Sequence, residues 1–314
     1  MKVAVTGSSG YLGQLVLRRL DADPAVGSIL GLDLFPSQFD SPKLTQQFAD
    51  VRTADLRRYF AGCDAVLHLA FVVSPPKHKS MADIEAINEG GSRRVFEESI
   101  EAGVPRIVFA SSAAAYGAHW DNPPVMTEDQ PLRPNDWWYY SRTKGRTERM
   151  LDDLQRRHPD AIIVRLRPSI FLGPTTDNPM GRMFAAPVMF LVEGERIVDL
   201  AWDDDVAEAF RLALHHPESD SFNLAGADPW SMKDYADRIG KRMVPIPRGA
   251  FLAFARLGRA SGLLSQGYFE WARAITAGPI VVSAQRARER LGWRPRLDAV
   301  GTLMEFAESR GLLR

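Results

Sequence analysis

The chain has little of three features that mark particular classes of protein: cysteine, charge of one sign, and long apolar runs. Cys63 is its only cysteine, so no internal disulfide or cysteine-based zinc site can form, as is typical of a reducing compartment. Lysine plus arginine equals aspartate plus glutamate, at 39 each, which leaves no basic excess for the phosphates of a nucleic acid. The longest apolar runs, 65–73 and 184–192, fall well short of the roughly 20 residues that span a bilayer.

The first residues already have a strand pattern, with no export signal before them. We therefore expect a soluble, cytoplasmic protein with neither a nucleic-acid nor a membrane partner.

Metal ligands are also not evident. None of the six histidines has the spacing of a metal site, such as His-Glu-x-x-His. His68 is expected inside a strand, and His215 and His216 at a solvated helix end. We expect no metal site.

What the sequence does contain is an alternation of short β-branched runs with longer stretches of helical period. This alternation is typical of crossover units on a parallel sheet, and it predicts an α/β fold with a doubly wound parallel sheet of the Rossmann type. The predicted strands are 2–7, 28–34, 64–70, 106–112 and 161–168, and the predicted helices are 11–22, about 80–102 and 138–157.

Beyond residue 168 prolines and glycines become denser and the elements shorter. We expect a dinucleotide-binding domain over 1–168 and a smaller, discontinuous C-terminal substrate lobe over 169–195 and 226–314. The segment 196–225 is expected to return to the first domain, because 203–226 has the pattern of one more helix and strand.

A glycine-rich turn, TGSSGYLG, lies directly after the first predicted strand and opens the first predicted helix. A dinucleotide pyrophosphate needs a tight turn, a place without a Cβ and the positive end of a helix, and Gly7, Gly10 and the helix start offer these. Gly13 would let the helix pack closely on the sheet. A nucleoside triphosphatase loop is excluded, since no Gly-Lys-Ser/Thr follows. The alternative is a plain strand-to-helix turn.

Asp33 ends the second predicted strand, twenty positions after Gly13. A carboxylate there can accept hydrogen bonds from the adenosine ribose and repels a 2′-phosphate, which favours NAD over NADP. The alternative is that Asp33 caps a loop turn.

Two adjacent tyrosines precede a lysine in NDWWYYSRTKGRTE, residues 135–148. Residues four apart lie on one face of a helix, so Tyr140 stands beside Lys144, and Tyr139 beside Thr143. A nearby ammonium favours the phenolate and would lower the pKa of Tyr140 by roughly 1–3 units, which makes a usable proton shuttle. Tyr139 is expected to pack with the two preceding tryptophans.

Ser111 and Ser112 lie at the carboxyl end of a predicted strand, at the edge where ligands bind in open α/β sheets. A hydroxyl at this edge could orient a substrate oxygen.

Taken in order, these motifs resemble the extended short-chain dehydrogenase/reductase superfamily, in its NAD-dependent epimerase/dehydratase branch. The resemblance covers nearly the whole chain. It rests on the glycine turn, Asp33, LHLA, Asn88 in INEGG, SSAAAYG, Tyr140-xxx-Lys144, RPSIFLGP and LGWRPR.

The resemblance implies a role for each matching position. Tyr140 would be the general acid/base, Lys144 would hold the nicotinamide ribose, Ser112 would bind the substrate oxygen and Asn88 would support the site. Members of the family often dimerise through the helices containing Asn88 and Tyr140, so a homodimer is expected. The positions implied to contact NAD are Gly7, Gly10, Tyr11, Leu12, Gly13, Asp33, Asp50, Val51, Leu69, Ala70, Asn88, Tyr140, Lys144, Pro168 and Ile170.

Three functions remain open: an oxidoreductase acting on a secondary alcohol or ketone of a small substrate, a nucleotide-sugar epimerase (an isomerase) with tightly bound NAD, and a non-catalytic NAD sensor. Dehydration of a sugar is disfavoured. The sugar dehydratases resemble one another in having Asp-Glu after the active-site hydroxyl, whereas this chain has Ala113-Ala114 there. Sugar epimerases commonly have Asn where this chain has Ile170 and a diphosphate-binding Arg where it has Val198, although Arg182 or Arg196 could compensate.

The segment 248–275 is apolar and basic. It could wall an apolar substrate pocket, or it could dip into a membrane surface. Packing is the favoured role, because arginine stems and aromatic rings commonly cover helix faces.

Overall fold

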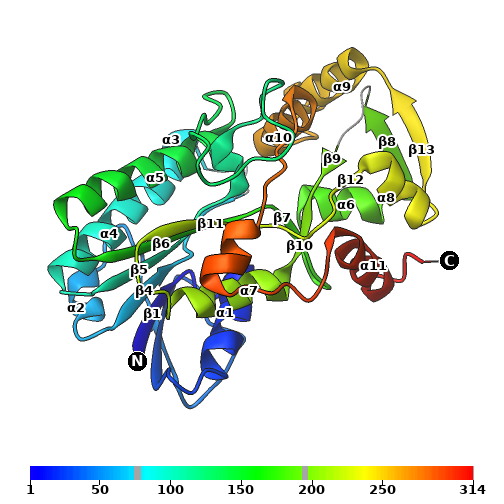
Figure 1. The fold of residues 1–314 in the computed structure, drawn as a ribbon. Helices are drawn as coiled ribbons and strands as arrows, with labels where there is room; N and C mark the ends of the chain where they lie inside the picture. Colours follow the sequence, from blue (N-terminus) through cyan, green and yellow to red (C-terminus); the bar gives the residue numbers. More distant parts are fainter. Residues whose placement is uncertain (74–78, 193–196, 314) are drawn as a thin grey trace.

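A computed structural model describes residues 1–73, 79–192 and 197–313 of the protein. Its centre is a seven-stranded sheet, in the order β11-β6-β5-β4-β1-β2-β3 (Figure 1). Every pairing in this sheet is parallel, so the predicted Rossmann-type fold is confirmed. The strands are β1 (Lys2–Thr6), β2 (Ser28–Asp33), β3 (Leu44–Phe48), β4 (Ala65–His68), β5 (Arg106–Ala110), β6 (Ile162–Pro168) and β11 (Asp220–Leu224).

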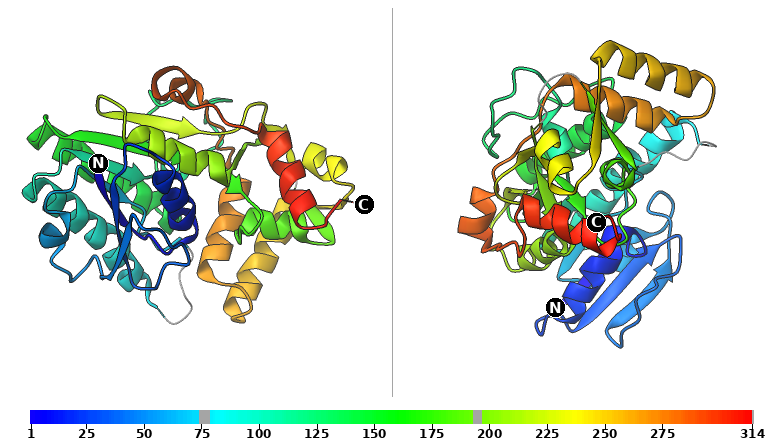
Figure 2. Two further views of the ribbon diagram at one scale, coloured as in Figure 1. Left: turned by 90° about the horizontal axis from the view of Figure 1, so that it is seen from below. Right: turned by 90° about the vertical axis from the view of Figure 1, so that its right-hand side faces the viewer.

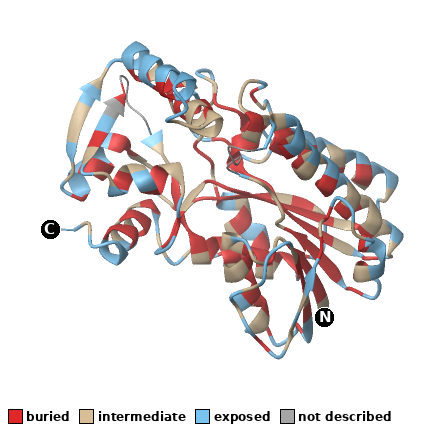
Figure 3. Ribbon diagram, turned by 180° about the vertical axis from the view of Figure 1, so that it is seen from behind, coloured by how far each residue is buried: buried red, intermediate tan, exposed pale blue. Residues whose placement is uncertain are grey.

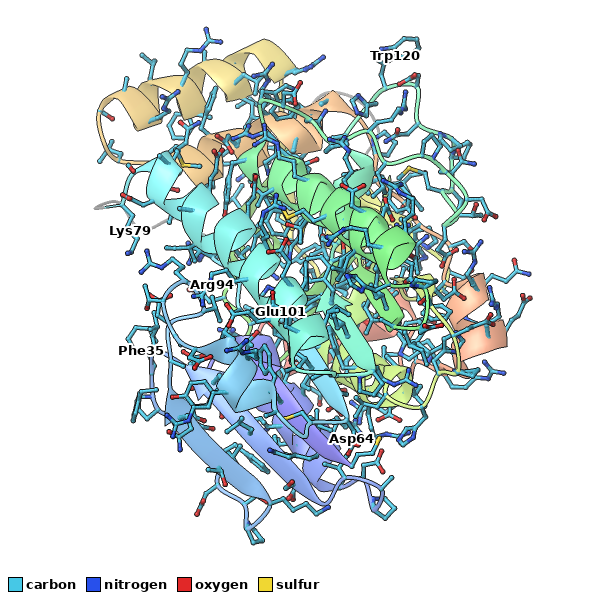
Figure 4. All side chains as sticks on the ribbon, turned by 90° about the vertical axis from the view of Figure 1, so that its left-hand side faces the viewer. Phe35, Asp64, Lys79, Arg94, Glu101 and Trp120 are labelled. Carbon is cyan, nitrogen blue, oxygen red and sulfur yellow. The ribbon has the colours of Figure 1, made fainter. Side chains whose placement is uncertain are left out.

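Helices cover both faces of the sheet, which explains why its central strands are apolar on both sides. On one face α1 (Tyr11–Asp21) and α7 (Asp203–Ala213) pack with the sheet into one buried apolar cluster. On the other face α2 (Leu56–Phe60), α4 (Gly91–Glu101) and α5 (Tyr139–Arg157) form a second cluster. Figure 4 looks onto this second face, where α4 and α5 run side by side.

Two elements of the first 168 residues were not predicted as such, the strand β3 and the helix α2. β3 has the sequence LTQQF and lies at the edge of the sheet with all five residues at least partly exposed, so it lacks the apolar run that marks a central strand. The helix predicted at about 80–102 is observed as α3 (Met81–Glu85), a π-helical turn η1 (Ala86–Gly90) and α4. Such a turn inserts one extra residue and is frequent at functional sites.

Residues after β6 build smaller elements around a third apolar cluster, to the right in Figure 1. Three two-stranded sheets form here, β7 with β10, β9 with β12, and β8 with β13. β11 pairs with β6 and so lies in the main sheet; the proposed domain boundaries stay a prediction. The elements are β7 (Ile170–Leu172), α6 (Pro179–Ala185), β8 (Val188–Val192), β9 (Ile197–Val198), β10 (Leu200–Trp202), β12 (Trp230–Ser231), α8 (Met232–Arg238), β13 (Arg242–Ile246), α9 (Arg248–Ala260), α10 (Gln266–Ala277), η3 (Ala287–Leu291) and α11 (Ala299–Ser309).

One expectation about the histidines is wrong. His216 is not a solvated helix end, because it is buried with its ring edge-on to Phe222, whereas His215 is exposed, as expected, and bonds Asp23. His68 does lie in a strand, and its two ring nitrogens are hydrogen-bonded to Thr6 and Ser92. Within the described ranges, no helix is long and apolar enough to cross a bilayer.

Candidate active site

The glycine-rich turn has the geometry of a dinucleotide-binding turn. Gly7 has a φ of 73°, and a Cβ on it would lie 2.5 Å from the backbone nitrogen of Ala70. A Cβ on Gly13 would lie 2.2 Å from the carbonyl oxygen of Gly7. Gly13 therefore lets α1 pack against the turn itself, rather than against the sheet as predicted.

The N-terminus of α1 has no side-chain cap, so its N–H groups are available to bind an anion. Gly10 is the N-cap residue, no side chain caps the helix, and its first turn carries no acidic residue. The first N–H groups of a helix lack partners inside the helix and, with the helix dipole, favour negative charge. Leu12 is partly buried and packs against the first apolar cluster.

Asp33 connects the turn to the end of β2. Its Oδ2 accepts a hydrogen bond from the N–H of Ser9 at 2.9 Å, and its Oδ1 accepts one from Phe35 at 3.1 Å. The loop-cap alternative is thus seen in the structure. It does not displace the predicted role, because Asp33 remains partly exposed at the carboxyl edge of the sheet.

Four further positions predicted to contact NAD follow β3 and β4. Asp50 is paired with Arg52 at 2.6 Å, which lowers the pKa of its carboxyl, and Val51 is buried against Gly91. Leu69 and Ala70 follow β4, with the backbone of Ala70 against Gly7.

Tyr140 and Ser112 meet at the carboxyl edge of the sheet. Ser112 follows β5, Tyr140 lies in the first turn of α5, and the Ser112 side chain lies close enough to the phenol to lower its pKa. The Tyr140 ring lies edge-on to Phe71, 5.7 Å between centroids, and 6.2 Å from Trp138.

Lys144 lies one helical turn after Tyr140 and is buried. Its Nζ donates to the carbonyl of Ala110 at 2.6 Å and sits 3.5 Å from the ring centroid of Phe71. The centroid of the Tyr140 ring is 5.7 Å from the same Nζ. The predicted pair therefore shares one face of α5, with the ammonium over an aromatic ring that sequence reasoning missed.

The predicted lowering of the pKa of Tyr140 is wrong for this structure. Burial raises the pKa of the phenol, and the hydrogen bond from Ser112 opposes that rise only in part. Burial also lowers the pKa of Lys144 to about 7. Desolvation disfavours both charged forms, and it outweighs the attraction that sequence spacing suggested.

Tyr139 does not pack with the two preceding tryptophans as predicted. Its hydroxyl donates to the backbone carbonyls of Val72 and Val73. Asn88, from η1, bonds both the N–H and the carbonyl of Val72, at 2.7 and 3.1 Å. Tyr139 and Asn88 thus hold the chain after β4 beside Phe71; the support of the site by Asn88 stays a prediction.

The structure also separates the two serines. Ser111 donates to Oε1 of Glu148 at 2.5 Å, and Glu148 forms a buried bidentate pair with Arg167. Arg167 continues this network to the hydroxyl of Tyr116 at 2.9 Å. Ser111 therefore belongs to a structural network below the sheet edge, and Ser112 alone faces Tyr140.

Sequence reasoning missed two further contacts. The hydroxyl of Tyr11 donates to Asp203 and accepts from Thr176 at 2.8 Å, which ties the start of α1 to the segments after β7 and β10; burial and Asp203 raise the pKa of Tyr11 to about 12. Glu270 of α10 bonds the first N–H of α5. Neither leaves a local sequence signal, because the partners are 192 and 131 residues apart.

The remaining predicted positions lie where the main sheet meets the small strands. Pro168 ends β6 and is buried, and Ile170 begins β7. Val198 ends β9. Arg182 is paired with Asp177 at 2.5 Å, and Arg196 lies outside the described residues.

These residues fit a dinucleotide. An uncapped helix start, a turn in which a Cβ would clash at Gly7 and Gly13, and a carboxylate at the end of β2 lie along one edge of the sheet, as a pyrophosphate and an adenosine ribose require. The other end of that edge carries Ser112 and Tyr140. The fold and site together define a Rossmann-type dinucleotide-binding protein.

Comparisons with known proteins agree. The sequence matches the NAD dependent epimerase/dehydratase family over residues 3–225. It is 27% identical, over 99% of this chain and 84% of the relative, to an uncharacterized protein of Mycobacterium tuberculosis. It is 26% identical, over 94% of this chain and 86% of the relative, to a mouse sterol-4-alpha-carboxylate 3-dehydrogenase, decarboxylating. The fold is similar to MoeE5 in complex with UDP-glucuronic acid and NAD, with a TM-score of 0.76, 22% identity and 98% of each chain covered.

The chain belongs to the NAD dependent epimerase/dehydratase family. It is an NAD-binding enzyme of that family, and the expectation of NAD as cofactor is confirmed.

Proposed function

We propose that the protein is an NAD-linked oxidoreductase that acts on a secondary alcohol or ketone of a small, largely apolar substrate. One observation carries this proposal: Ser112 and Tyr140 lie together at the carboxyl edge of the sheet, close enough for the Ser112 side chain to lower the pKa of the phenol, and Lys144 lies one helical turn from Tyr140. This arrangement places a proton-transfer group and a hydrogen-bonding hydroxyl where one substrate oxygen can meet both.

NAD, when bound, accepts or returns the hydride. In this proposal the phenol oxygen of Tyr140 takes the proton of an alcohol, or gives one to a ketone, and Ser112 holds the same substrate oxygen. Because burial raises the pKa of Tyr140, the phenol is protonated at neutral pH, the form needed to reduce a ketone. Oxidation of an alcohol needs the phenolate form of Tyr140. The charged ammonium of Lys144 favours the phenolate, and Lys144 is charged at pH values below its pKa of about 7.

The surroundings of Tyr140 support an apolar substrate. Phe71 and Trp138 lie against its ring, and Ala113 and Ala114, which follow Ser112, are small, buried and uncharged. With no carboxylate at these two positions, elimination of water has no evident base. The mouse relative, whose name specifies a sterol substrate, is consistent with this substrate class.

A second candidate, a nucleotide-sugar epimerase, is favoured by one cavity. A cavity of about 400 Å³ next to the start of α5 is lined by Trp137, Arg248 and Arg273, among others. The guanidinium of Arg273 lies 4.2 Å from the ring centroid of Trp137. Cations and an aromatic ring at one cavity could receive the diphosphate and base of a nucleotide sugar, such as the UDP-glucuronic acid named for MoeE5.

The test of the first candidate uses the two tyrosines as a matched pair. Tyr140→Phe should lower turnover by at least about a thousandfold and leave NAD binding unchanged by calorimetry. Tyr139→Phe removes the hydroxyl of the neighbouring tyrosine and should keep most turnover while lowering the free energy of unfolding by about 1 kcal/mol. The assay follows NADH with a panel of sterols and simpler secondary alcohols.

Unchanged turnover in Tyr140→Phe would exclude the acid/base role. The epimerase candidate predicts instead that UDP-sugars bind, that Arg273→Ala weakens this binding, and that no net NADH forms. NAD binding without turnover of any of these compounds would favour a non-catalytic sensor.

A further inference from the structure

The ammonium of Lys144 is a buried cation without a carboxylate of its own. Lys144 is 2% exposed, and within the described ranges of the chain it forms no ion pair. Glu148, one turn further along α5, attracts the ammonium, but both of its oxygens accept hydrogen bonds from the guanidinium of Arg167. A buried charge is stable only where other groups replace the water that it has lost. Groups other than a carboxylate must therefore stabilise the charged form of Lys144.

The carbonyl of Ala110 and the ring of Phe71 contact this ammonium. Nζ donates to the carbonyl at 2.6 Å and lies 3.5 Å from the centroid of the ring. The face of an aromatic ring attracts a cation, most strongly where water is excluded. A second ring, Phe109, is 5.0 Å from Nζ but belongs to β5, one of the central strands that Figure 3 shows as buried. Phe71 is partly exposed, so it is the ring that lies between the ammonium and solvent.

The backbone at Phe71 is held in place by side chains of η1 and α5. The N–H and the carbonyl of Val72, the next residue, bond the side chain of Asn88 at 2.7 and 3.1 Å. The hydroxyl of Tyr139 donates to the same carbonyl at 2.7 Å. The Phe71 ring lies edge-on to Tyr140, 5.7 Å between centroids. These contacts give the ring a fixed place beside the phenol that is proposed to transfer the proton.

The helix that carries Lys144 is held by a different part of the chain. α10 is the inner of the two adjacent helices α9 and α10 (Figure 2), and its Glu270 accepts a hydrogen bond from the first N–H of α5 at 2.9 Å. The ring and the helix are thus each held by contacts that do not involve the ammonium. A change of the Phe71 side chain should therefore change the surroundings of Nζ without moving the helix.

Phe71 acts on the charge of Lys144 in two opposite ways. The face of the ring attracts the cation and favours the charged form. The ring also excludes water, and burial favours the neutral form. Burial is the larger effect, since it lowers the pKa of Lys144 to about 7 although Glu148 attracts the ammonium.

The other titratable side chains that face Lys144 come from α5 and β4. On α5, Tyr140 is a neutral phenol near pH 7, because burial raises its pKa. Glu148 is ionised, because burial, which raises the pKa of its carboxyl, is outweighed by Arg167. On β4, burial and then the charge of Lys144 lower the pKa of His68 to about 3, so the imidazole is neutral. None of these groups responds to a change at Phe71 near neutral pH, so the charge of Lys144 is the property to measure.

We propose that Phe71 is a positioning residue of the active site: its ring holds the ammonium of Lys144 against the carbonyl of Ala110, keeps water from it, and so controls whether Lys144 is charged when Tyr140 transfers a proton. The consequence for turnover rests on the proposed function, whereas the effect on Lys144 is a property of the protein without substrate. The two are therefore measured separately.

The first experiment measures the protonation of Lys144 in the full chain, without NAD or substrate. The lysine side chains are labelled with carbon-13 at Cε, and their resonances are followed by NMR from acid to alkaline pH. Lys144→Met identifies the resonance of Lys144 by its loss. In the wild type this resonance should titrate near pH 7, whereas an ordinary lysine titrates near 10.4.

Variants of Phe71 separate the two effects of the ring. Phe71→Ala admits water to Nζ, so Lys144 should titrate at least about one pH unit higher than in the wild type. Phe71→Leu keeps an apolar side chain but removes the ring face, so the titration should move about one pH unit lower. Phe71→Tyr keeps the ring and should restore the wild-type titration.

Trp138→Leu is the matched control for these variants. Trp138 also lies beside Tyr140, 6.2 Å between ring centroids, but the rings that the structure describes near Nζ are those of Phe71, Phe109 and Tyr140. The control should leave the titration of Lys144 unchanged. NAD binding by calorimetry shows that each variant is folded.

The second experiment follows the pH dependence of turnover. In the wild type, oxidation of an alcohol should decline as the pH rises through the titration of Lys144, because the phenolate of Tyr140 then loses the charge that favours it. The decline should move with the NMR titration, to higher pH in Phe71→Ala and to lower pH in Phe71→Leu. A ring with only a structural role would change the amount of turnover but not the pH of the decline.

The proposal would be overturned if Lys144 titrated at the same pH in the wild type, Phe71→Ala and Phe71→Leu, or if Trp138→Leu shifted the titration equally. Should Phe71→Ala not fold, equal titration in Phe71→Leu and Phe71→Tyr would overturn it. A shifted titration that the decline in turnover does not follow would confirm the effect of Phe71 on Lys144 and would count instead against proton transfer by Tyr140.

Discussion

The carboxylate of Glu270 accepts a hydrogen bond from the backbone N–H of Tyr139, at 2.9 Å. Tyr139 is the first residue of α5, and no side chain of its own N-cap residue, Trp138, caps the helix. The carboxylate from α10 therefore satisfies a free donor at the start of the helix that carries Tyr140, and its charge complements the helix dipole. This contact connects the elements after residue 225 to the proposed proton-transfer group.

Replacing Glu270 should affect both stability and activity. Glu270→Ala should lower the free energy of unfolding by about 1–2 kcal/mol and lower turnover, because the first turn of α5 loses its cap. Glu270→Gln keeps an acceptor oxygen and should show a smaller loss of both. Denaturant unfolding and the NADH assay measure the two effects. Glu305→Ala, at an exposed glutamate in α11, is the control. If it lowered stability and turnover as much as Glu270→Ala, the loss would not be due to the hydrogen bond between Glu270 and Tyr139.

The packing of Gly13 predicts a specific sensitivity of NAD binding. A Cβ at this position would lie 2.2 Å from the carbonyl oxygen of Gly7, so Gly13→Ala must move α1 away from the turn. NAD affinity should fall at least about tenfold by calorimetry, and the free energy of unfolding by about 1–3 kcal/mol.

Gly249→Ala provides the comparison, since nothing lies within 4 Å of a Cβ there. It should leave NAD affinity unchanged and stability equal or slightly higher. Wild-type affinity in Gly13→Ala would show that the turn does not hold the cofactor.

Asp33 should set the preference between the two dinucleotides. Asp33→Asn keeps an acceptor for the N–H of Ser9 but removes the charge that would repel a 2′-phosphate. NAD affinity should fall by about tenfold, and the ratio of NAD to NADP affinity should fall further. Asp40→Asn makes the same change of charge at an exposed position nearby and should alter neither. Calorimetric titration of both dinucleotides would contradict this prediction if the ratio stayed constant.

Asp199 should give stability a pH dependence of unusual sign. Burial raises the pKa of its carboxyl to about 7, whereas an unfolded aspartate titrates near 3.9. The folded protein thus holds a proton between about pH 4 and 7 that the unfolded chain has lost. The stability that this proton supports is present below pH 4 and is lost as the pH rises to 7.

Asp199→Asn cannot titrate and retains an oxygen for the N–H of Val282, which Asp199 binds at 2.8 Å. Relative to the wild type it should gain stability as the pH rises from 4 to 8, on the order of a few kcal/mol. Denaturant unfolding across this range measures the difference. Asp160→Asn, at an exposed aspartate, should run parallel to the wild type, and a parallel Asp199→Asn curve would contradict the prediction.

The sequence by itself was enough for the architecture of the main sheet. The runs around β1, β4, β5 and β6 are apolar because helices cover both faces of these strands, and such burial leaves a continuous pattern in the chain. The edge strand β3 escaped prediction for the same reason, since it is not covered in this way. The glycine turn and the pairing of Tyr140 with Lys144 were also predictable, because backbone conformation and helical spacing are local.

Only the tertiary structure decided how the site residues are used. In the structure Ser112 lies beside Tyr140, whereas Ser111 bonds Glu148. The ring of Phe71 lies under the ammonium of Lys144. The hydroxyl of Tyr139 donates to the backbone carbonyl of Val72. The tertiary structure also reversed the expected pKa shift of Tyr140, and it exposed one face of α9 while burying another. Burial, desolvation and contacts between residues more than a hundred positions apart, such as Glu270 with Tyr139, depend on how distant segments pack, which spacing along the chain does not record.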